Sequence, residues 1–224
     1  MTPAASTYSS SKVVDGPNGA GPNVTTPSVT EQFFLLNGVQ EGTSKYNRIG
    51  DRIKMKSIQI MGKWVPRSAL PAPAVQTRIY GRLAIIYDRY PKGNFPGVNE
   101  VFQMYSETGA PIMGTMPWSP PNPVYSDRFI IIRDCKFNFT TNDPTDSNIM
   151  ALFMMNNNTV EGNDCSLYKK LNGLETQFLS TANPILVGNI GTGTLLFLVW
   201  SNQTGADNAP GNFEWSWRLR FYDY

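Results

Sequence analysis

The sequence predicts an all-β fold, a single jelly-roll β-sandwich of eight antiparallel strands with long inter-strand loops and at most one short helix. Apolar stretches of strand length follow one another along the chain, and loops rich in proline, glycine and asparagine separate them. No stretch of useful length has a helical period. An immunoglobulin-like sandwich is the second choice, although the Cys-Trp-Cys pattern of antibody domains is absent.

The closing segment, residues 212–224, has the clearest strand pattern. Large apolar residues occupy every second position, and polar or charged residues fill the positions between them. Burying such a stripe is worth about 1.5–3 kcal/mol per side chain, which a strand obtains only against a facing sheet about 10 Å away. The apolar positions are Phe213, Trp215, Trp217, Leu219 and Phe221.

Composition divides the chain at about residue 30. Residues 1–30 are rich in Ser, Thr, Pro, Gly and Asn, and their only charges, on Lys12 and Asp15, cancel. Such a segment cannot offset its own ordering entropy. We therefore expect a low-complexity, neutral and mobile N-terminal tail over residues 1–30 and one jelly-roll domain over residues 31–224.

Within that domain the expected strands differ in pattern. The alternation changes phase near Ser57, which implies a bulge or a sharp bend. Residues 193–202 are apolar on both faces and belong in the middle of a sheet or beneath an interface. The connection 90–126 holds seven prolines and one plausible helical turn, and a connection this long usually has a function. Strands are expected at 31–39, 51–65, 78–89, 127–139, 166–178, 193–202 and 212–224.

Composition excludes several kinds of site. The chain contains no histidine, which removes Ser-His-Asp and Cys-His nucleophiles and every zinc site that needs imidazole. The candidate catalytic acids, Asp88, Glu100, Asp134 and Glu175, are not tied into a pair by their spacing. We expect no catalytic residue, no metal and no cofactor.

The two cysteines and the apolar runs lead to two further expectations. Cys135 and Cys165 could pair, but their spacing does not require it, and we expect half-buried free thiols. No segment approaches the roughly 18–20 apolar residues of a membrane span, so we expect no membrane insertion.

The basic residues are the most informative polar feature. The formal net charge is only +2, so a nucleic-acid partner would have to be met by a local patch. If strands 78–89 and 212–224 share a sheet, four guanidiniums and two tyrosines gather on one outer face, as on a phosphate-contacting surface with stacking partners. A solvated face, or salt bridges at a subunit contact, is the alternative for this set and for a second basic stripe. The first set is Arg78, Tyr80, Arg82, Arg218, Arg220 and Tyr222, and the second is Arg52, Lys54 and Lys56.

Several short motifs occur in a recognisable order: YNRIGDRIKMKSIQI (46–60), LAIIYDR (83–89) followed by PKG (91–93), VNEVF (98–102) and RLRFYD (218–223). In this order the chain resembles, from about residue 31 to 224, the capsid proteins of circular Rep-encoding single-stranded DNA viruses, the geminivirus- and circovirus-like group. Each motif is weak singly, and their order and spacing carry the resemblance.

The resemblance implies a structural protein that is not an enzyme. Identical subunits would form an icosahedral, T=1-like shell around circular single-stranded DNA, with basic side chains lining the lumen. The protein would be found in the virion and, during assembly, inside the host cell. A nuclear location is expected from the family, but the sequence contains no nuclear-import signal.

One feature departs from this family, whose members usually carry an arginine-rich arm before the jelly roll. Residues 1–30 are neutral here, so the arm was removed, the inner face alone packages the genome, or the shells are empty. With the inner face alone we expect weak, salt-sensitive DNA binding. Two other functions stay open: the capsid of a plus-strand RNA virus, and a carbohydrate-binding jelly roll with an aromatic platform drawn from Trp64, Trp118, Trp200 or loop tyrosines.

Overall fold

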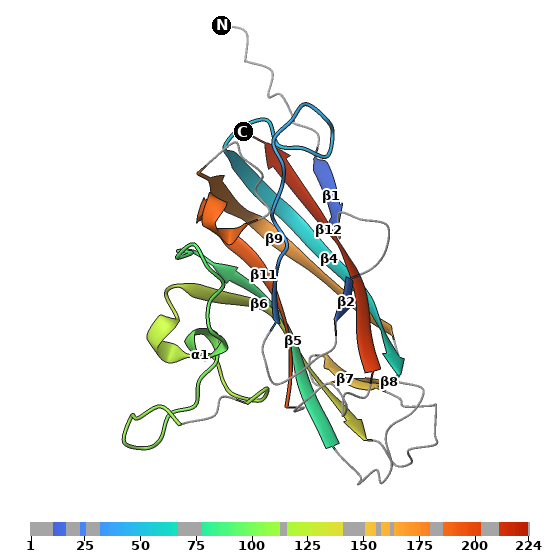
Figure 1. Cartoon of the computed structure of the whole chain (residues 1–224), viewed down its shortest axis with the longest axis vertical. Helices are drawn as coiled ribbons and strands as arrows, with labels where there is room; N and C mark the ends of the chain where they lie inside the picture. The colour runs from blue at the N-terminus through green and yellow to red at the C-terminus, as the bar shows by residue number, and fades with distance from the viewer. Residues whose placement is uncertain are drawn as a thin grey trace, which may run out of the picture.

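Two six-stranded sheets form an all-β jelly-roll sandwich, which confirms the predicted fold class (Figure 1). In one sheet, sheet A, the strand order is β1-β12-β4-β9-β10, and β2 also pairs with β12; in the other, sheet B, it is β3-β11-β5-β6-β7-β8. Late strands pair with early ones, β12 with β4 and β11 with β5, so the two ends of the domain wrap around each other. The structure, a computed structural model, describes residues 11–16, 23–25, 32–66, 78–112, 116–140, 151–155, 158–161, 164–179, 186–202 and 211–223.

The seven strand ranges expected from the sequence are all present, and five further short strands bring the number to twelve among the described residues, against the eight predicted for the fold. Sheet A contains β1 (Lys12–Gly16), β2 (Asn23–Thr25), β4 (Arg52–Pro66), β9 (Asp164–Phe178), β10 (Ile190–Thr192) and β12 (Gly211–Asp223). Sheet B contains β3 (Gln32–Leu35), β5 (Arg78–Asp88), β6 (Phe129–Thr140), β7 (Ala151–Met155), β8 (Asn158–Glu161) and β11 (Thr194–Ser201).

The main core lies between the sheets and contains the apolar stripe of β12. All five stripe residues are at most 8% exposed. Trp215 contacts two rings of sheet B, with ring centroids 5.0 Å from Phe34 and 4.8 Å from Phe197. The expectation that this strand needs a facing sheet is confirmed.

The phase change in β4 is a bulge. The pairing of β4 with β9 shifts register between Met55 and Ser57, and its pairing with β12 shifts beside Arg220. Opposite the bulge, Asn172 and Gly173 of β9 have positive φ angles of 51° and 79°, a conformation open to Gly and tolerated by Asn. The shift keeps both halves of β4 directed into the core, with Ile53, Met55, Ile58 and Ile60 fully buried.

A second apolar core lies on the outer face of sheet B, under the connection between β5 and β6 (residues 89–128). This connection contains the helix α1 (Val98–Val101) and the 3₁₀ turn η1 (Pro123–Tyr125). In Figure 1 α1 lies beside β11 and β6, away from β4 and β12. The β5–β6 connection therefore buries the second face of β11 within the same chain. The buried residues are Ala84, Ile86, Val98, Val101, Phe102, Phe129, Leu196, Leu198 and Trp200.

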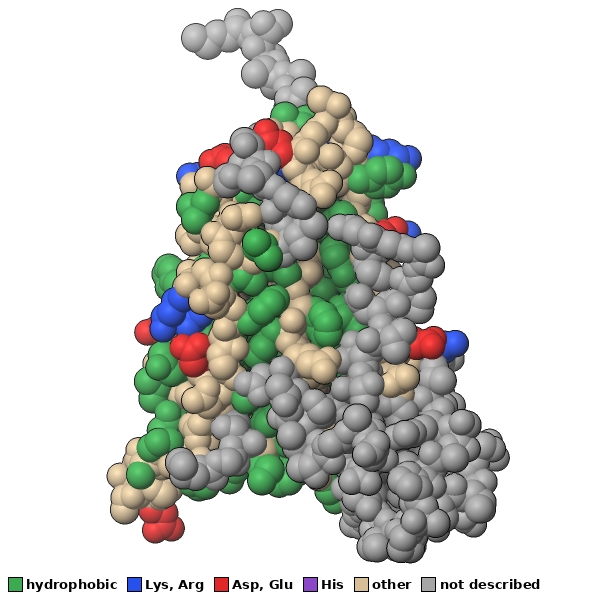
Figure 2. Space-filling view, in the orientation of Figure 1, with side chains coloured by type: hydrophobic (Ala, Val, Ile, Leu, Met, Phe, Trp, Pro, Cys, Tyr) green, Lys and Arg blue, Asp and Glu red, His purple; other side chains and the backbone are tan. Residues whose placement is uncertain are grey.

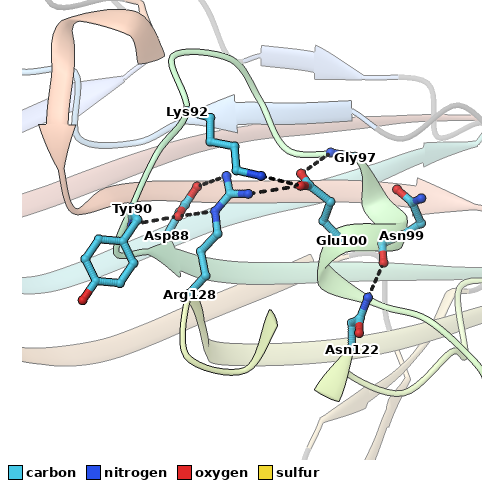
Figure 3. Close-up of polar contacts among 8 residues, drawn as sticks. All are labelled: Asp88, Tyr90, Lys92, Gly97, Asn99, Glu100, Asn122 and Arg128. Atoms are coloured by element: carbon cyan, nitrogen blue, oxygen red, sulfur yellow. Dashed lines mark hydrogen bonds and ion pairs between the residues drawn. The ribbon is translucent and has the colours of Figure 1, made fainter. Parts of the chain in front are cut away.

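Arg128 fixes the end of the β5–β6 connection to β5 (Figure 3). Its Nε and Nη2 donate to the two carboxylate oxygens of Asp88 at 2.9 and 2.7 Å, and its Nη1 donates to Glu100 at 3.2 Å. Glu100 also accepts from the backbone N–H of Gly97 at 3.2 Å, which closes the first turn of α1. Burial lowers the pKa of Arg128, but the Asp88 and Glu100 carboxylates more than offset this effect, so the guanidinium stays charged.

Arg82 forms an equivalent clamp nearer the start of β5. Its guanidinium binds both carboxylate oxygens of Asp134 on β6, at 2.7 and 2.6 Å. It also donates to the carbonyl oxygens of Pro117 and Ser119, at 3.1 and 2.5 Å, and lies 3.5 Å from the centroid of the Phe102 ring. Arg82 and Arg128, referred to below as the arginine clamps, thus hold the β5–β6 connection on sheet B from two points.

Part of the expected N-terminal tail is paired with sheet A. β1 and β2 both run antiparallel to β12, with Asp15 opposite Arg218 and Val24 opposite Glu214. The expectation of a mobile tail is therefore wrong for residues 12–16 and 23–25, because β12 offers its unpaired edge to them. The domain boundary at residue 31 stays a prediction.

The cysteines are free, and both are more deeply buried than expected. Cys135 and Cys165 are 0% and 3% exposed. Burial raises the pKa of Cys135 to about 11 and that of Cys165 to about 12, so neither thiol is reactive at neutral pH.

Removing one partner of a clamp should destabilise the fold. Asp88→Asn leaves the charge of Arg128, which is 8% exposed, without its main partner, and we expect a loss of about 3–5 kcal/mol in the free energy of unfolding in denaturant titrations. Lys92→Gln is the control. Lys92 also pairs with Glu100, at 3.4 Å, but its side chain is 65% exposed, and an exposed ion pair contributes about 1 kcal/mol or less. Equal losses in the two variants would contradict the role of this clamp.

Candidate nucleic-acid interface

The two sheets differ in what covers their outer faces. The β5–β6 connection covers the outer face of β5 and β11 in sheet B, whereas β12, β4 and β9 of sheet A carry exposed or half-buried polar side chains on most of their outer positions. In the view of Figure 2, hydrophobic side chains gather in the middle and the few basic ones lie at the margins, next to acidic ones. The basic residues are thus not gathered on that side of the molecule.

On sheet A the strand register brings basic residues of three strands into neighbouring rows. Ser57 of β4 pairs with Arg220 on one side and with Lys170 of β9 on the other. In the next row Lys54 lies between Tyr222 and Glu175. Side chains directly opposite each other have Cβ atoms about 4.5–5.5 Å apart, so these rows form one surface. We call this surface the basic face: Arg52, Lys54, Lys56, Lys170, Arg218, Arg220 and Tyr222.

Several cations of the basic face are available to a ligand. Within the described part of the chain, Arg52, Arg220 and Lys170 have no carboxylate partner. Lys54 lies 3.5 Å from Glu175, with both side chains about half exposed, and such a pair is weak in water. The ammonium of Lys56 lies 5.3 Å from the centroid of the Tyr222 ring.

Arg218 differs, because the N-terminal strand β1 supplies it with a carboxylate. Its Nε and Nη2 donate to the two oxygens of Asp15 at 2.7 and 2.8 Å. The hydrogen bonds from Arg218 hold the pKa of Asp15 below its ordinary value, and the same pair raises the pKa of Arg218. A phosphate that contacts Arg218 must compete with this exposed ion pair.

The structure divides the first predicted set, because its β5 members lie in sheet B and its β12 members lie in sheet A. Arg82 is 1% exposed and engaged in its clamp, so the expectation that it faces outward with Arg218 and Arg220 is wrong. Tyr80 is half-buried, with its ring edge-on to Trp118 at 5.7 Å. The side chain of Arg78 lies outside the described residues.

The second predicted stripe, by contrast, lies beside β12. Arg52, Lys54 and Lys56 project from β4 on the same face as Arg220 and Tyr222. Lys170 and Tyr168 of β9 also belong to this face, and the sequence reasoning missed them. The alternation in CSLYKKL (165–171) was the available signal, but it could not tell which strand lies next to β9.

The sequence also offered carboxylates and tryptophans for other functions. Each of the four carboxylates considered for catalysis is ion-paired: Asp88 and Glu100 with Arg128, Asp134 with Arg82, and Glu175 with Lys54. Trp200 is 2% exposed and lies in the second core, so it offers no ring to a sugar. Trp118 is 45% exposed, and the side chain of Trp64 lies outside the described residues.

Among the described residues, His, Cys, Asp and Glu side chains form no group that could hold a metal ion. No helix in the same ranges has the length and apolar character needed to cross a membrane.

A jelly-roll sandwich is the architecture of viral capsid subunits, and also of lectin domains and cupins. The sequence matches the Geminivirus coat protein/nuclear export factor BR1 family over residues 3–206, and the chain belongs to this family. The resemblance to capsid proteins of circular single-stranded DNA viruses is thereby confirmed, and the protein is a coat protein of the geminivirus type. The match begins inside the expected tail and ends before β12. No curated protein matches the sequence.

The Asp15–Arg218 pair gives the attachment of β1 a pH dependence. Because the pKa of Asp15 is lowered in the folded chain, the stabilisation is fully present above the ordinary carboxyl pKa of about 3.9 and is lost as the pH falls through the lower folded-state value. Hydrogen-exchange protection factors of the β1 amides should therefore decrease in that acidic range. Asp15→Asn should show lower protection at neutral pH and a smaller decrease, because the ion pair between Lys12 of β1 and Asp223 of β12 remains in the variant; an identical pH profile in the variant would contradict this.

Proposed function

We propose that this coat protein assembles into a closed icosahedral, T=1-like shell of identical copies around circular single-stranded DNA, with the basic face lining the lumen. The observation that carries the proposal is the contrast between the two sheets. Sheet B is covered by its own β5–β6 connection, and sheet A presents cations from three strands. Membership of the coat protein family supports the assembly role.

Contacts to phosphate would come first from the cations that have no carboxylate partner among the described residues. Arg52, Arg220 and Lys170 can bind phosphate without breaking an ion pair, and each such contact releases counterions. Residues 1–30 carry no net charge, so they add little to this attraction. Binding by a single subunit is therefore weak and strongly salt-dependent, and many copies on one strand would supply the total affinity.

Exposed apolar side chains on the loops support contacts between copies. In the described ranges, the large hydrophobic residues that are more than three-fifths exposed lie on loops and turns, not on the basic face, and stable subunit contacts bury such surface. They are Ile49, Tyr90, Val124, Leu179 and Leu186.

Electron microscopy of the purified protein at several salt concentrations, with nuclease treatment of any nucleic acid, tests the proposal. We expect uniform closed particles whose cargo is degraded by DNase after the shell is opened. Particles with RNase-sensitive cargo would indicate an RNA virus capsid. A single subunit in every buffer that still binds DNA would favour an export factor, the other activity in the family's description. Glycan binding by single subunits without assembly would favour the carbohydrate-binding alternative.

Removing one cation of the basic face should change the salt dependence of binding. For a single-stranded oligonucleotide, Arg220→Gln should reduce the slope of log K against log salt by about 0.7, the amount expected for one lost phosphate contact. Lys92→Gln is the matched control, because Lys92 is 65% exposed but lies on the β5–β6 connection. Equal slopes for Arg220→Gln and the unmodified protein would exclude Arg220 from the interface, as would an equal reduction by Lys92→Gln.

A further inference from the structure

The outer face of sheet A continues beyond the basic face into a neutral region around Tyr168. In the row next to Arg220, Gln59 of β4 lies between Arg218 and Tyr168. Tyr168 is 52% exposed, and Lys170 follows it by two positions on the same strand. A half-exposed aromatic ring thus stands directly beside the cations.

A shallow surface depression begins one row of side chains beyond Gln59 and Tyr168. Its volume is about 520 Å³, within the range of small-molecule sites. In the row after Gln59, Met61 lies between two small residues, Ser216 and Ser166, and these three side chains line the depression. Met61 is itself 45% exposed and presents an apolar side chain there. The lining also contains the ion pair of Lys63 with Glu214 but not the ring of Tyr168, so the depression lies next to a base stacked on Tyr168 and does not enclose it.

The two tyrosines of this sheet face differ in availability. Lys56 approaches the Tyr222 ring, with its ammonium 5.3 Å from the ring centroid, so a cation already occupies the vicinity of that ring. No ring or cation contact involves Tyr168 within the described part of the chain. Of the two rings, Tyr168 is the one open to a ligand.

We propose that Tyr168 is a base-stacking site, which makes the sheet A face selective for unpaired nucleic-acid strands. The inference rests on the proposed binding of nucleic acid by the basic face. The sugar–phosphate backbone of the nucleic acid lies over Arg220 and Lys170. An unpaired base stacks on the ring of Tyr168, on the side of Met61. In a duplex the bases are stacked on one another, so they offer no free face to a ring on an open sheet. Because every base has such a face, the site discriminates by strandedness and not by sequence.

Stacking and phosphate contact differ in their salt dependence, and this difference provides the test. Labelled oligothymidine and a duplex of the same length are titrated by fluorescence anisotropy over a series of salt concentrations. We expect Tyr168→Ala to weaken single-strand binding about 5- to 150-fold at an unchanged salt slope, with duplex binding unchanged. Tyr168→Phe, which keeps the ring, should bind like the unmodified protein. Lys170→Gln should weaken both substrates and reduce both slopes.

The possible outcomes separate this inference from the proposed function. Equal weakening of single strand and duplex by Tyr168→Ala would overturn the stacking site, and so would a Tyr168→Phe variant as weak as Tyr168→Ala. In both cases an effect of Lys170→Gln would still support the basic face. If Lys170→Gln and Arg220→Gln also leave binding unchanged, the proposed interface itself is wrong. Unchanged thermal unfolding of the Tyr168 variants confirms that their fold is intact.

Discussion

The arrangement of the molecule depends on the two arginine clamps, which hold the β5–β6 connection to β5. Arg82 binds Asp134 and two loop carbonyls, and Arg128 binds Asp88 and Glu100, so these two buried guanidiniums donate to oxygen atoms. A buried charge without such partners is costly. If the β5–β6 connection left sheet B, both arginines would lose these partners and the apolar core beneath the connection would be exposed. The clamps thus determine which sheet of the sandwich remains open.

This constraint assigns different functions to the two sheets. Sheet B uses both faces for burial, with β11 packed against sheet A on one side and against α1 on the other. Sheet A uses one face for the core and leaves the other to cations of three strands and to Tyr168. A coat subunit needs such a division, because one surface must bind a polyanion while the remaining surfaces are free for contacts between copies.

The sequence predicted those features that depend on local periodicity. The alternation in β12, the phase change at Ser57 and the doubly apolar β11 follow directly from the order of residue types. Local periodicity could not predict that Arg82 is buried. Its partner Asp134 lies 52 residues away, and the β5–β6 connection that covers it also follows later in the chain. The composition of the basic face likewise depends on pairing between strands that are distant in the sequence. Lys170 belongs to it only because the register places β9 beside β4.

The central claim, that nucleic acid binds the outer face of sheet A, is tested most directly by lysine footprinting. Acetylation of each lysine is measured by mass spectrometry in DNA-free and DNA-bound protein of the same assembly state. The account predicts that DNA protects Lys54, Lys56 and Lys170, while Lys92 and Lys136 on the sheet B side stay equally reactive. Protection of Lys92 and Lys136 with Lys170 still fully reactive would contradict it.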